Sequence, residues 1–166
     1  MLHFFLVFLA IQGVLFSAEL SRPVQQAIVI PFTNGIATLS AWLIKQFDAG
    51  VIAYGNVIRD QQNGFAVAVE AGCNGVEATI VLVAAMLAMP APWRLKLWGI
   101  GLGFLAIQAM NLLRIISLFY LGQWNQTAFE WAHLYIWQAL IMLDVLVVFI
   151  IWLRYLPARE SPARAA

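Results

Sequence analysis

Four long runs of apolar residues, separated by shorter polar stretches, dominate the pattern of this chain. They cover residues 1–18, 74–89, 97–121 and 133–153. About 20 mostly apolar residues, with a range of roughly 17–25, carry a helix across the hydrocarbon core of a bilayer. We therefore expect about four transmembrane helices.

Composition supports a membrane location, because 63% of the residues are hydrophobic and only 10% are charged. Soluble domains carry about a quarter charged residues. We predict an all-α integral membrane protein with a single domain at 1–156 and a disordered cytoplasmic tail at 157–166. The net charge of +1 gives no indication of nucleic-acid binding, and one cysteine excludes an internal disulfide and a multi-cysteine metal site.

The first apolar run has the length of a signal peptide, but it lacks a basic residue at its start. A cleavage site near its end would place the bulky Leu15 or Phe16 where small residues are preferred. We expect a retained transmembrane helix that ends at Arg22-Pro23.

Residues 24–47 are apolar enough to cross a membrane, but Pro31 and the turn pair Asn34-Gly35 interrupt them. Beyond this break, apolar residues recur at helical spacing. We interpret the segment as an interfacial helix lying on the membrane, with a second spanning helix as the alternative.

Two β-prone runs follow, at residues 51–58 and 65–70. Asn63-Gly64 lies directly before the second run and is a hairpin signal. The sequence predicts a short hairpin, within a periplasmic insertion at about residues 20–73.

Basic residues near the apolar runs predict the sidedness of the chain. Arg94 and Lys96 lie in the loop after the second run, and three arginines follow the last run. Cytoplasmic loops carry an excess of lysine and arginine. We therefore expect both ends inside, with the region before residue 73 and the loop near residue 127 outside.

The single cysteine, Cys73, lies between the hairpin and the second apolar run. Asn74 is a favoured N-cap and Glu77 follows three residues later, which is the spacing of a capping box. A helix start and a nearby cation would both lower the pKa of a thiol. A small packing residue is the ordinary alternative for a membrane cysteine.

Three residues of different helices reach the same side of the membrane in this topology. Cys73 starts the second run, Arg114 lies eight residues before Gly122, and His133 starts the last run. An arginine at this depth indicates a function by default. The histidine has a simpler interpretation as part of an aromatic belt at the interface.

Other polar residues of the apolar runs receive supporting assignments. Asn111 lies one turn before Arg114 and is expected to support it, and Glu77 is a second candidate partner for Arg114. We assign Asp144 to a buried structural hydrogen bond, because it lies about three turns from His133.

At these residues the chain resembles the exosortases, polytopic membrane proteins with a cysteine motif, an Asn-x-x-Arg motif and a later histidine. The matching segments are Gly72-Cys73-Asn74-Gly75, Asn111-Leu112-Leu113-Arg114 and His133. Small size and the Gly-Cys-Asn-Gly-x-Glu form are most similar to the short exosortase H type. Larger exosortases have serine where this chain has Asn74.

The resemblance implies a cysteine transpeptidase or peptidase of the bacterial inner membrane, with catalytic Cys73, Arg114 and His133 facing the periplasm. Implied substrates are exported proteins whose C-terminal signal contains a short motif, a transmembrane helix and a basic cluster, and the acceptor is unknown. We expect no cofactor and no metal ion. The alternative is a non-catalytic adaptor that binds transmembrane helices of partner proteins, in which Arg114 pairs with Glu77 or Asp144.

Overall fold

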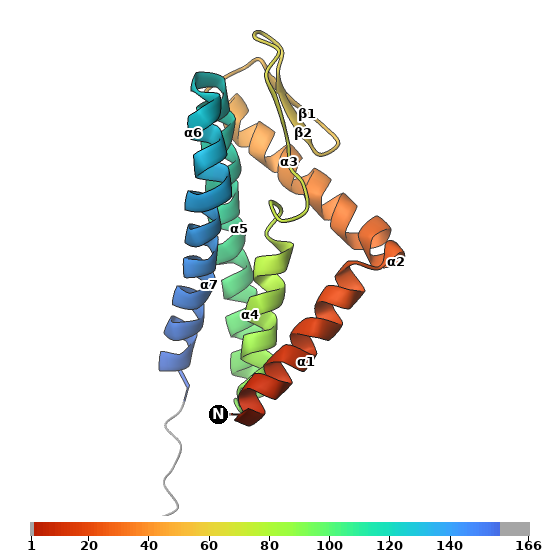
Figure 1. Cartoon of the computed structure of the whole chain (residues 1–166), viewed down its shortest axis with the longest axis vertical. Coiled ribbons are helices and arrows are strands. Elements are labelled where there is room, and N and C mark those ends of the chain that lie inside the picture. The colour runs from red at the N-terminus through yellow and green to blue at the C-terminus, as the bar shows by residue number, and fades with distance from the viewer. Residues whose placement is uncertain (1, 157–166) are drawn as a thin grey trace, which may run out of the picture.

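The computed structural model describes residues 2–156, and it is a helical protein with one small antiparallel sheet (Figure 1). This confirms the predicted fold class. Four helical stretches are long and apolar enough to cross a membrane, by length and composition: Leu2–Glu19 (α1), Arg22–Lys45, Trp93–Trp124 (α5) and Gln126–Arg154. The last comprises α6 (Gln126–Trp131), the π-helix η2 (Ala132–Ile136) and α7 (Trp137–Arg154).

The second predicted span is shorter than expected. Helix α4 (Val76–Ala88) has 13 residues, which at 1.5 Å per residue is about 20 Å long, against roughly 30 Å of hydrocarbon. The fourth long apolar helix is instead Arg22–Lys45. The number of long apolar helices equals the predicted number of spans, but by length alone Arg22–Lys45 is included and α4 is not. Helix α4 nevertheless packs between α1, α5 and α7.

The break predicted at Pro31 and Asn34-Gly35 is wrong. The chain is helical without interruption through α2 (Arg22–Val24), the π-helix η1 (Gln25–Val29) and α3 (Ile30–Lys45). Proline has no N–H, and its ring clashes with the carbonyl four residues earlier. The wider π-turn, closed by a hydrogen bond from Ile30 N to Gln25 O, lies just before Pro31 and relieves this clash.

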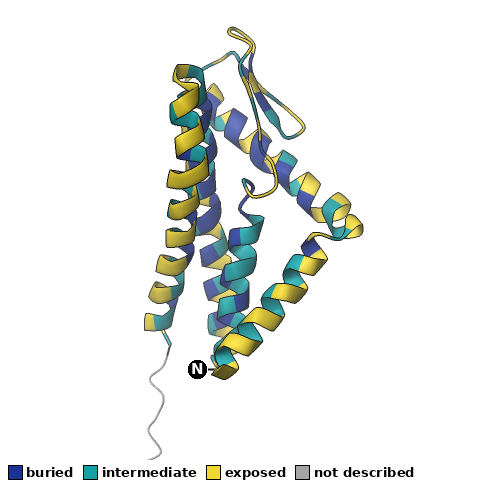
Figure 2. Cartoon of the chain, in the orientation of Figure 1, coloured by how far each residue is buried: buried dark blue, intermediate teal, exposed yellow. Residues whose placement is uncertain are grey.

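The lower part of the bundle is formed by α1, α4, α5 and α7, with α4 packed against the other three. Gly103 allows this close packing, since a Cβ there would lie 2.4 Å from Leu82 of α4 and 3.0 Å from Val148 of α7. Lys96 Nζ donates to Leu87 O at 2.9 Å and so satisfies a carbonyl at the end of α4. Outward-facing residues of α1 and α7 are exposed (Figure 2), as expected for lipid-facing helices.

The sheet has three strands rather than the predicted two. Strands β1 (Val51–Tyr54), β2 (Val57–Asp60) and β3 (Ala66–Ala68) pair antiparallel in that order. Gly55-Asn56 forms a two-residue turn between Tyr54 and Val57, and Gly55 has φ of +59°. A positive φ at a two-residue hairpin turn favours glycine, and the Gly-Asn pair is the signal that the sequence analysis missed.

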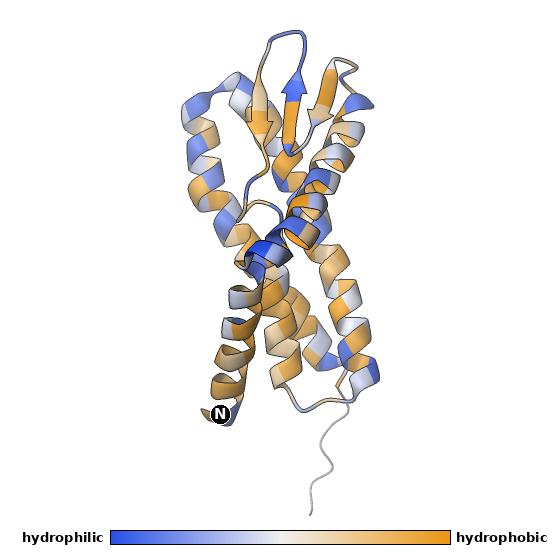
Figure 3. Cartoon of the chain, turned by 90° about the vertical axis from the view of Figure 1, so that its right-hand side faces the viewer, coloured by the Kyte–Doolittle hydropathy of each residue, from blue (hydrophilic) through white to orange (hydrophobic). Residues whose placement is uncertain are grey.

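One face of the sheet packs on α3 and on the upper part of α5. Its core includes Val51, Ile58 and Val69 from the sheet region, Ile44 of α3 and Phe119 of α5. Hydrophobic residues dominate the lower half of the molecule, and hydrophilic residues gather at mid-height and above (Figure 3).

Both chain ends of the described region lie at the same end of the molecule as the α4–α5 turn, opposite the sheet and the α5–α6 connection (Figure 1). This arrangement agrees with an even number of crossings between the ends. The disordered tail predicted at 157–166 lies outside the described residues.

Candidate functional site

The candidate site begins in the loop between β3 and α4, which contains Cys73. Val69 N donates to Asn56 O at 2.8 Å, which keeps the start of the loop on the sheet. The loop then turns, with Cys73 N donating to Glu70 O at 2.9 Å. Gly72 has φ of +82°, a conformation that suits glycine.

Asn74 anchors the loop to α3. Its side chain is fully buried and donates from Nδ2 to Thr33 Oγ1 at 3.0 Å, while its Oδ1 accepts from Val76 N at 3.0 Å. The predicted capping box is therefore wrong in its details, since the N-cap residue is Gly75. Glu77 accepts a hydrogen bond from Gly72 N at 2.6 Å and so stabilises the loop rather than Asn74.

Arg114 of α5 reaches the loop with two nitrogens. Nη1 donates to Gly72 O at 3.1 Å and Nη2 donates to Cys73 Sγ at 3.4 Å. The guanidinium is buried, with 3% of the residue exposed. Glu77 thus bonds to the N–H of Gly72, and Arg114 bonds to its carbonyl. Arg114 pairs with neither Glu77 nor Asp144.

His133 of η2 completes the arrangement, with Nε2 4.0 Å from Cys73 Sγ. The structure therefore brings together Cys73, Arg114 and His133, which come from a loop and two helices far apart in sequence. These are the nucleophile, cation and base types required for acyl transfer by a thiol.

Burial raises the pKa of the Cys73 thiol above its usual range, and the positive charge of Arg114 opposes this rise. Carboxylates of Glu77 and Glu70 raise the pKa further. The expected net lowering is therefore wrong, because loss of hydration disfavours the thiolate more than one cation favours it.

Phe129 positions the ring of His133 and was missed by the sequence analysis. The two rings stack with centroids 5.7 Å apart and planes at 8°. The signal was their spacing of four residues, which places two side chains on the same helix face. His133 Nδ1 is buried and has no hydrogen-bond partner within residues 2–156.

The supporting residues of α5 and α7 lie below the thiol. Asn111 is fully buried one turn below Arg114, and its side-chain nitrogen and oxygen make no hydrogen bond within residues 2–156. The same holds for Gln108, whose amide packs directly against Gly75. Asp144 Oδ2 is also without a partner in the described chain, so the structural hydrogen bond expected there is not formed by that oxygen.

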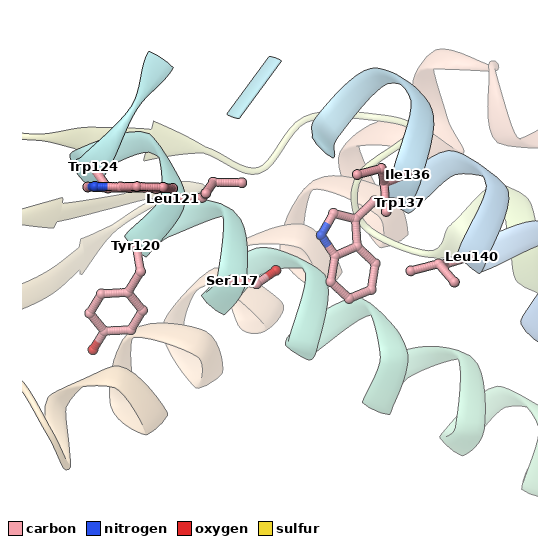
Figure 4. A pocket seen from close by; sticks show the side chains of 7 residues that line it. All are labelled: Ser117, Tyr120, Leu121, Trp124, Ile136, Trp137 and Leu140. Carbon is pink, nitrogen blue, oxygen red and sulfur yellow. The ribbon is translucent and has the colours of Figure 1, made fainter. Parts of the chain in front are cut away.

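Two hollows of the protein have linings that do not include Cys73. An apolar hollow of about 440 Å³ lies between α5 and the η2–α7 helix and is lined by residues such as Tyr120, Trp124 and Trp137 (Figure 4). A smaller one of about 310 Å³, between η1–α3 and the loop, has a polar lining that includes Asn34 and Glu70. Within residues 2–156, no cluster of three histidine, cysteine, aspartate or glutamate side chains could hold a metal ion.

Comparison with protein families identifies the chain. The family described as transmembrane exosortase (Exosortase_EpsH) matches residues 2–160, which is almost the whole length. The protein belongs to the transmembrane exosortase family. No curated protein and no solved structure matches the chain. The family match confirms the resemblance found in the sequence. In this exosortase the arginine and the histidine of the motifs both lie within 4.0 Å of the cysteine sulfur.

Proposed function

We propose that this exosortase is a cysteine transpeptidase that cleaves a C-terminal sorting signal of exported proteins and transfers the new C-terminus to an acceptor. One observation carries the proposal. Cys73 Sγ has a guanidinium nitrogen at 3.4 Å and an imidazole nitrogen at 4.0 Å, contributed by two different helices.

The first step is acylation of the thiol. Cys73 Sγ attacks the carbonyl carbon of the scissile peptide bond, and its proton passes to His133 Nε2. The resulting tetrahedral intermediate collapses when the C–N bond breaks, and His133 returns the proton to the leaving amine. A thioester links the substrate to Cys73.

The second step releases the product. An acceptor amine attacks the thioester carbonyl, the C–S bond breaks, and the proton lost by the amine passes through His133 to the thiol. With water as the acceptor, the same steps give hydrolysis and a free carboxylate.

Arg114 stabilises negative charge at two stages. It lies beside the sulfur, where it favours the developing thiolate. Its Nε is buried and without a partner in residues 2–156, so it is the donor that we assign to the oxyanion. One such donor contributes about 2.7–4 kcal/mol in other acyl transferases.

A non-catalytic adaptor is less well supported. That function requires no reactive thiol and predicts that Arg114 pairs with Glu77 or Asp144. Arg114 contacts Gly72 and Cys73 instead.

The location of the enzyme is inferred from its basic residues. We place the enzyme in the bacterial inner membrane with Cys73 facing the periplasm, because the basic start of α5, with Arg94 and Lys96, lies at the opposite end from the sheet. Exported proteins with a C-terminal transmembrane helix and basic cluster are then the partners, since their cleavage region reaches this face.

The test is co-expression with a candidate tail-anchored substrate, followed by mass spectrometry of the processed C-terminus. Cys73→Ala should abolish processing while the protein stays folded, because the half-buried thiol contributes little packing volume. Cys73→Ser should be almost as inactive, since a hydroxyl is a far weaker nucleophile. Processing by Cys73→Ala at the parental rate would refute the transpeptidase.

A further inference from the structure

Strand β3 has backbone groups that point away from the sheet. In an antiparallel pair, hydrogen-bonded residue pairs alternate with non-hydrogen-bonded ones. Asp60 N donates to Phe65 O and Val69 N donates to Asn56 O. Val67 lies two residues from both Phe65 and Val69 and faces Ile58, so it is the residue of β3 whose backbone groups bond to β2. The N–H and C=O groups of Ala66 and Ala68 therefore point toward the free edge.

This edge is open in the described chain. β3 is the terminal strand of the sheet and pairs only with β2. Ala66 and Ala68 are exposed, and their methyl side chains leave room beside the strand. Proteins commonly protect such edges with charges, proline or bulges. Residues 65–69 contain no charge and no proline.

The open edge leads directly to the thiol. Four residues separate Ala68 from Cys73, and the chain descends from β3 through the loop into α4 (Figure 1). Phe65 lies just before β3, and Phe129 stacks on the ring of His133. Both phenylalanine side chains lie next to Gly122 of α5. An open strand edge five positions before Cys73 is therefore a place to hold an extended polypeptide beside the sulfur.

We propose that β3 binds the extended segment of the substrate that precedes the scissile bond, as an added parallel strand. The inference rests on the proposed function. There, the substrate chain runs from its folded domain outside the membrane toward its C-terminal transmembrane helix. β3 runs the same way, from the outer end toward α4, so the two strands are parallel.

Parallel pairing assigns individual hydrogen bonds. The substrate residue opposite Val67 donates its N–H to Ala66 O and accepts at its carbonyl from Ala68 N. The residue two positions later, nearer the scissile bond, donates to Ala68 O. Backbone pairing of this kind provides affinity without requiring a particular side chain.

The test uses the full-length protein and an electrophilic peptide, acetyl-tetra-alanyl chloromethyl ketone. Its methylene carbon forms a thioether with Cys73 Sγ, chloride leaves, and the thiol proton is released. Chloroacetone is the reference reagent without a peptide. Mass spectrometry of the Cys73 peptide measures both rates.

We expect the peptide reagent to alkylate Cys73 at least about tenfold faster than chloroacetone, because each backbone hydrogen bond contributes roughly a twofold to tenfold preference. Ala68→Pro removes the outward N–H and leaves the ladder to β2 intact, as proline is tolerated at strand edges. It should abolish most of this preference and leave the chloroacetone rate unchanged.

Ala53→Pro is the matched control. Gln61 N donates to Gly50 O, so Ala53 is a non-hydrogen-bonded position at the opposite edge of the same sheet. This variant should keep the peptide preference. A second measurement needs no variant: N-methylation of successive peptide nitrogens should slow the reaction only at alternate positions, which is the period of a strand.

A peptide preference that is equal in the parent and Ala68→Pro, or an N-methylation profile without alternation, would overturn the proposal. So would loss of a dimer in Ala68→Pro with the peptide rate unchanged, which would assign the edge to a second copy of the chain. If Cys73 reacts with neither reagent, the proposed function itself fails.

Discussion

Removing the hydroxyl of Thr33 should destabilise the loop that carries Cys73. Asn74 is fully buried, and its amide donates to Thr33 Oγ1 at 3.0 Å. Thr33→Val keeps the side-chain volume but leaves this donor without its partner. A buried unsatisfied donor costs about 1–3 kcal/mol. We expect the free energy of unfolding to fall by that amount, and substrate processing to fall because the thiol moves relative to Arg114.

Thr33→Ser is the matched control, because it keeps the hydroxyl and loses one methyl group, worth about 0.8 kcal/mol. Thermal unfolding followed by circular dichroism would compare the variants in one detergent. A double-mutant cycle with Asn74→Leu should show a coupling energy of about 0.5–3 kcal/mol. Equal stability of Thr33→Val and the parent, or additive effects in the cycle, would refute the role of this hydrogen bond.

Three further results are expected. The alkylation rate of Cys73 should rise with pH only above the usual thiol range, since burial raises the pKa of the thiol. Arg114→Leu should move this rate–pH curve to higher pH, and Arg114→Lys should leave it near that of the parent. Three superimposable curves would place Arg114 away from the thiol. Gly75→Ala should lower the unfolding midpoint more than Gly72→Ala. Both glycines have a positive φ, but only at Gly75 would an added Cβ approach another side chain, with Gln108 Nε2 at 2.7 Å. Equal shifts of the midpoint in the two variants would contradict this prediction. Reporter fusions after residues 60 and 127 should report the periplasm and those after 93 and 160 the cytoplasm, and a cytoplasmic signal at 60 would invalidate the sidedness.

The approach of Cys73, Arg114 and His133 could be predicted because each lies near the outer end of an apolar run, and runs of alternating direction bring such ends together. The helix at Pro31 could not be predicted from local signals, because a π-turn and packing against the sheet override the proline and the Asn-Gly pair. The hydrogen bond between Thr33 and Asn74 joins residues 41 positions apart, and nothing in either segment indicates the other.

The same limit applies to energetics. Proximity to Arg114 and to a helix start suggested an acidic thiol, but burial depends on how the whole loop packs and outweighs the nearby cation. An argument from the sequence about pairs of residues takes nearby charges into account, but it omits the hydration that the thiol loses when the loop packs. The capping pattern likewise identified residues that stabilise the loop, although Glu77 bonds to Gly72 rather than to Asn74.

The shortness of α4 has a consequence for the chemical environment of the reaction. In the proposed orientation, a helix of 13 residues covers only about 20 Å of the roughly 30 Å of hydrocarbon, so the sulfur lies below the outer lipid ester groups instead of in bulk water. A substrate must be drawn down to that depth, where low water activity protects a thioester from hydrolysis and favours an amine. Membrane thickness should then affect whether the thioester is hydrolysed or transferred to an amine. In reconstituted vesicles, longer acyl chains should lower the ratio of hydrolysis to transfer, and a ratio independent of chain length would show that the sulfur is fully hydrated.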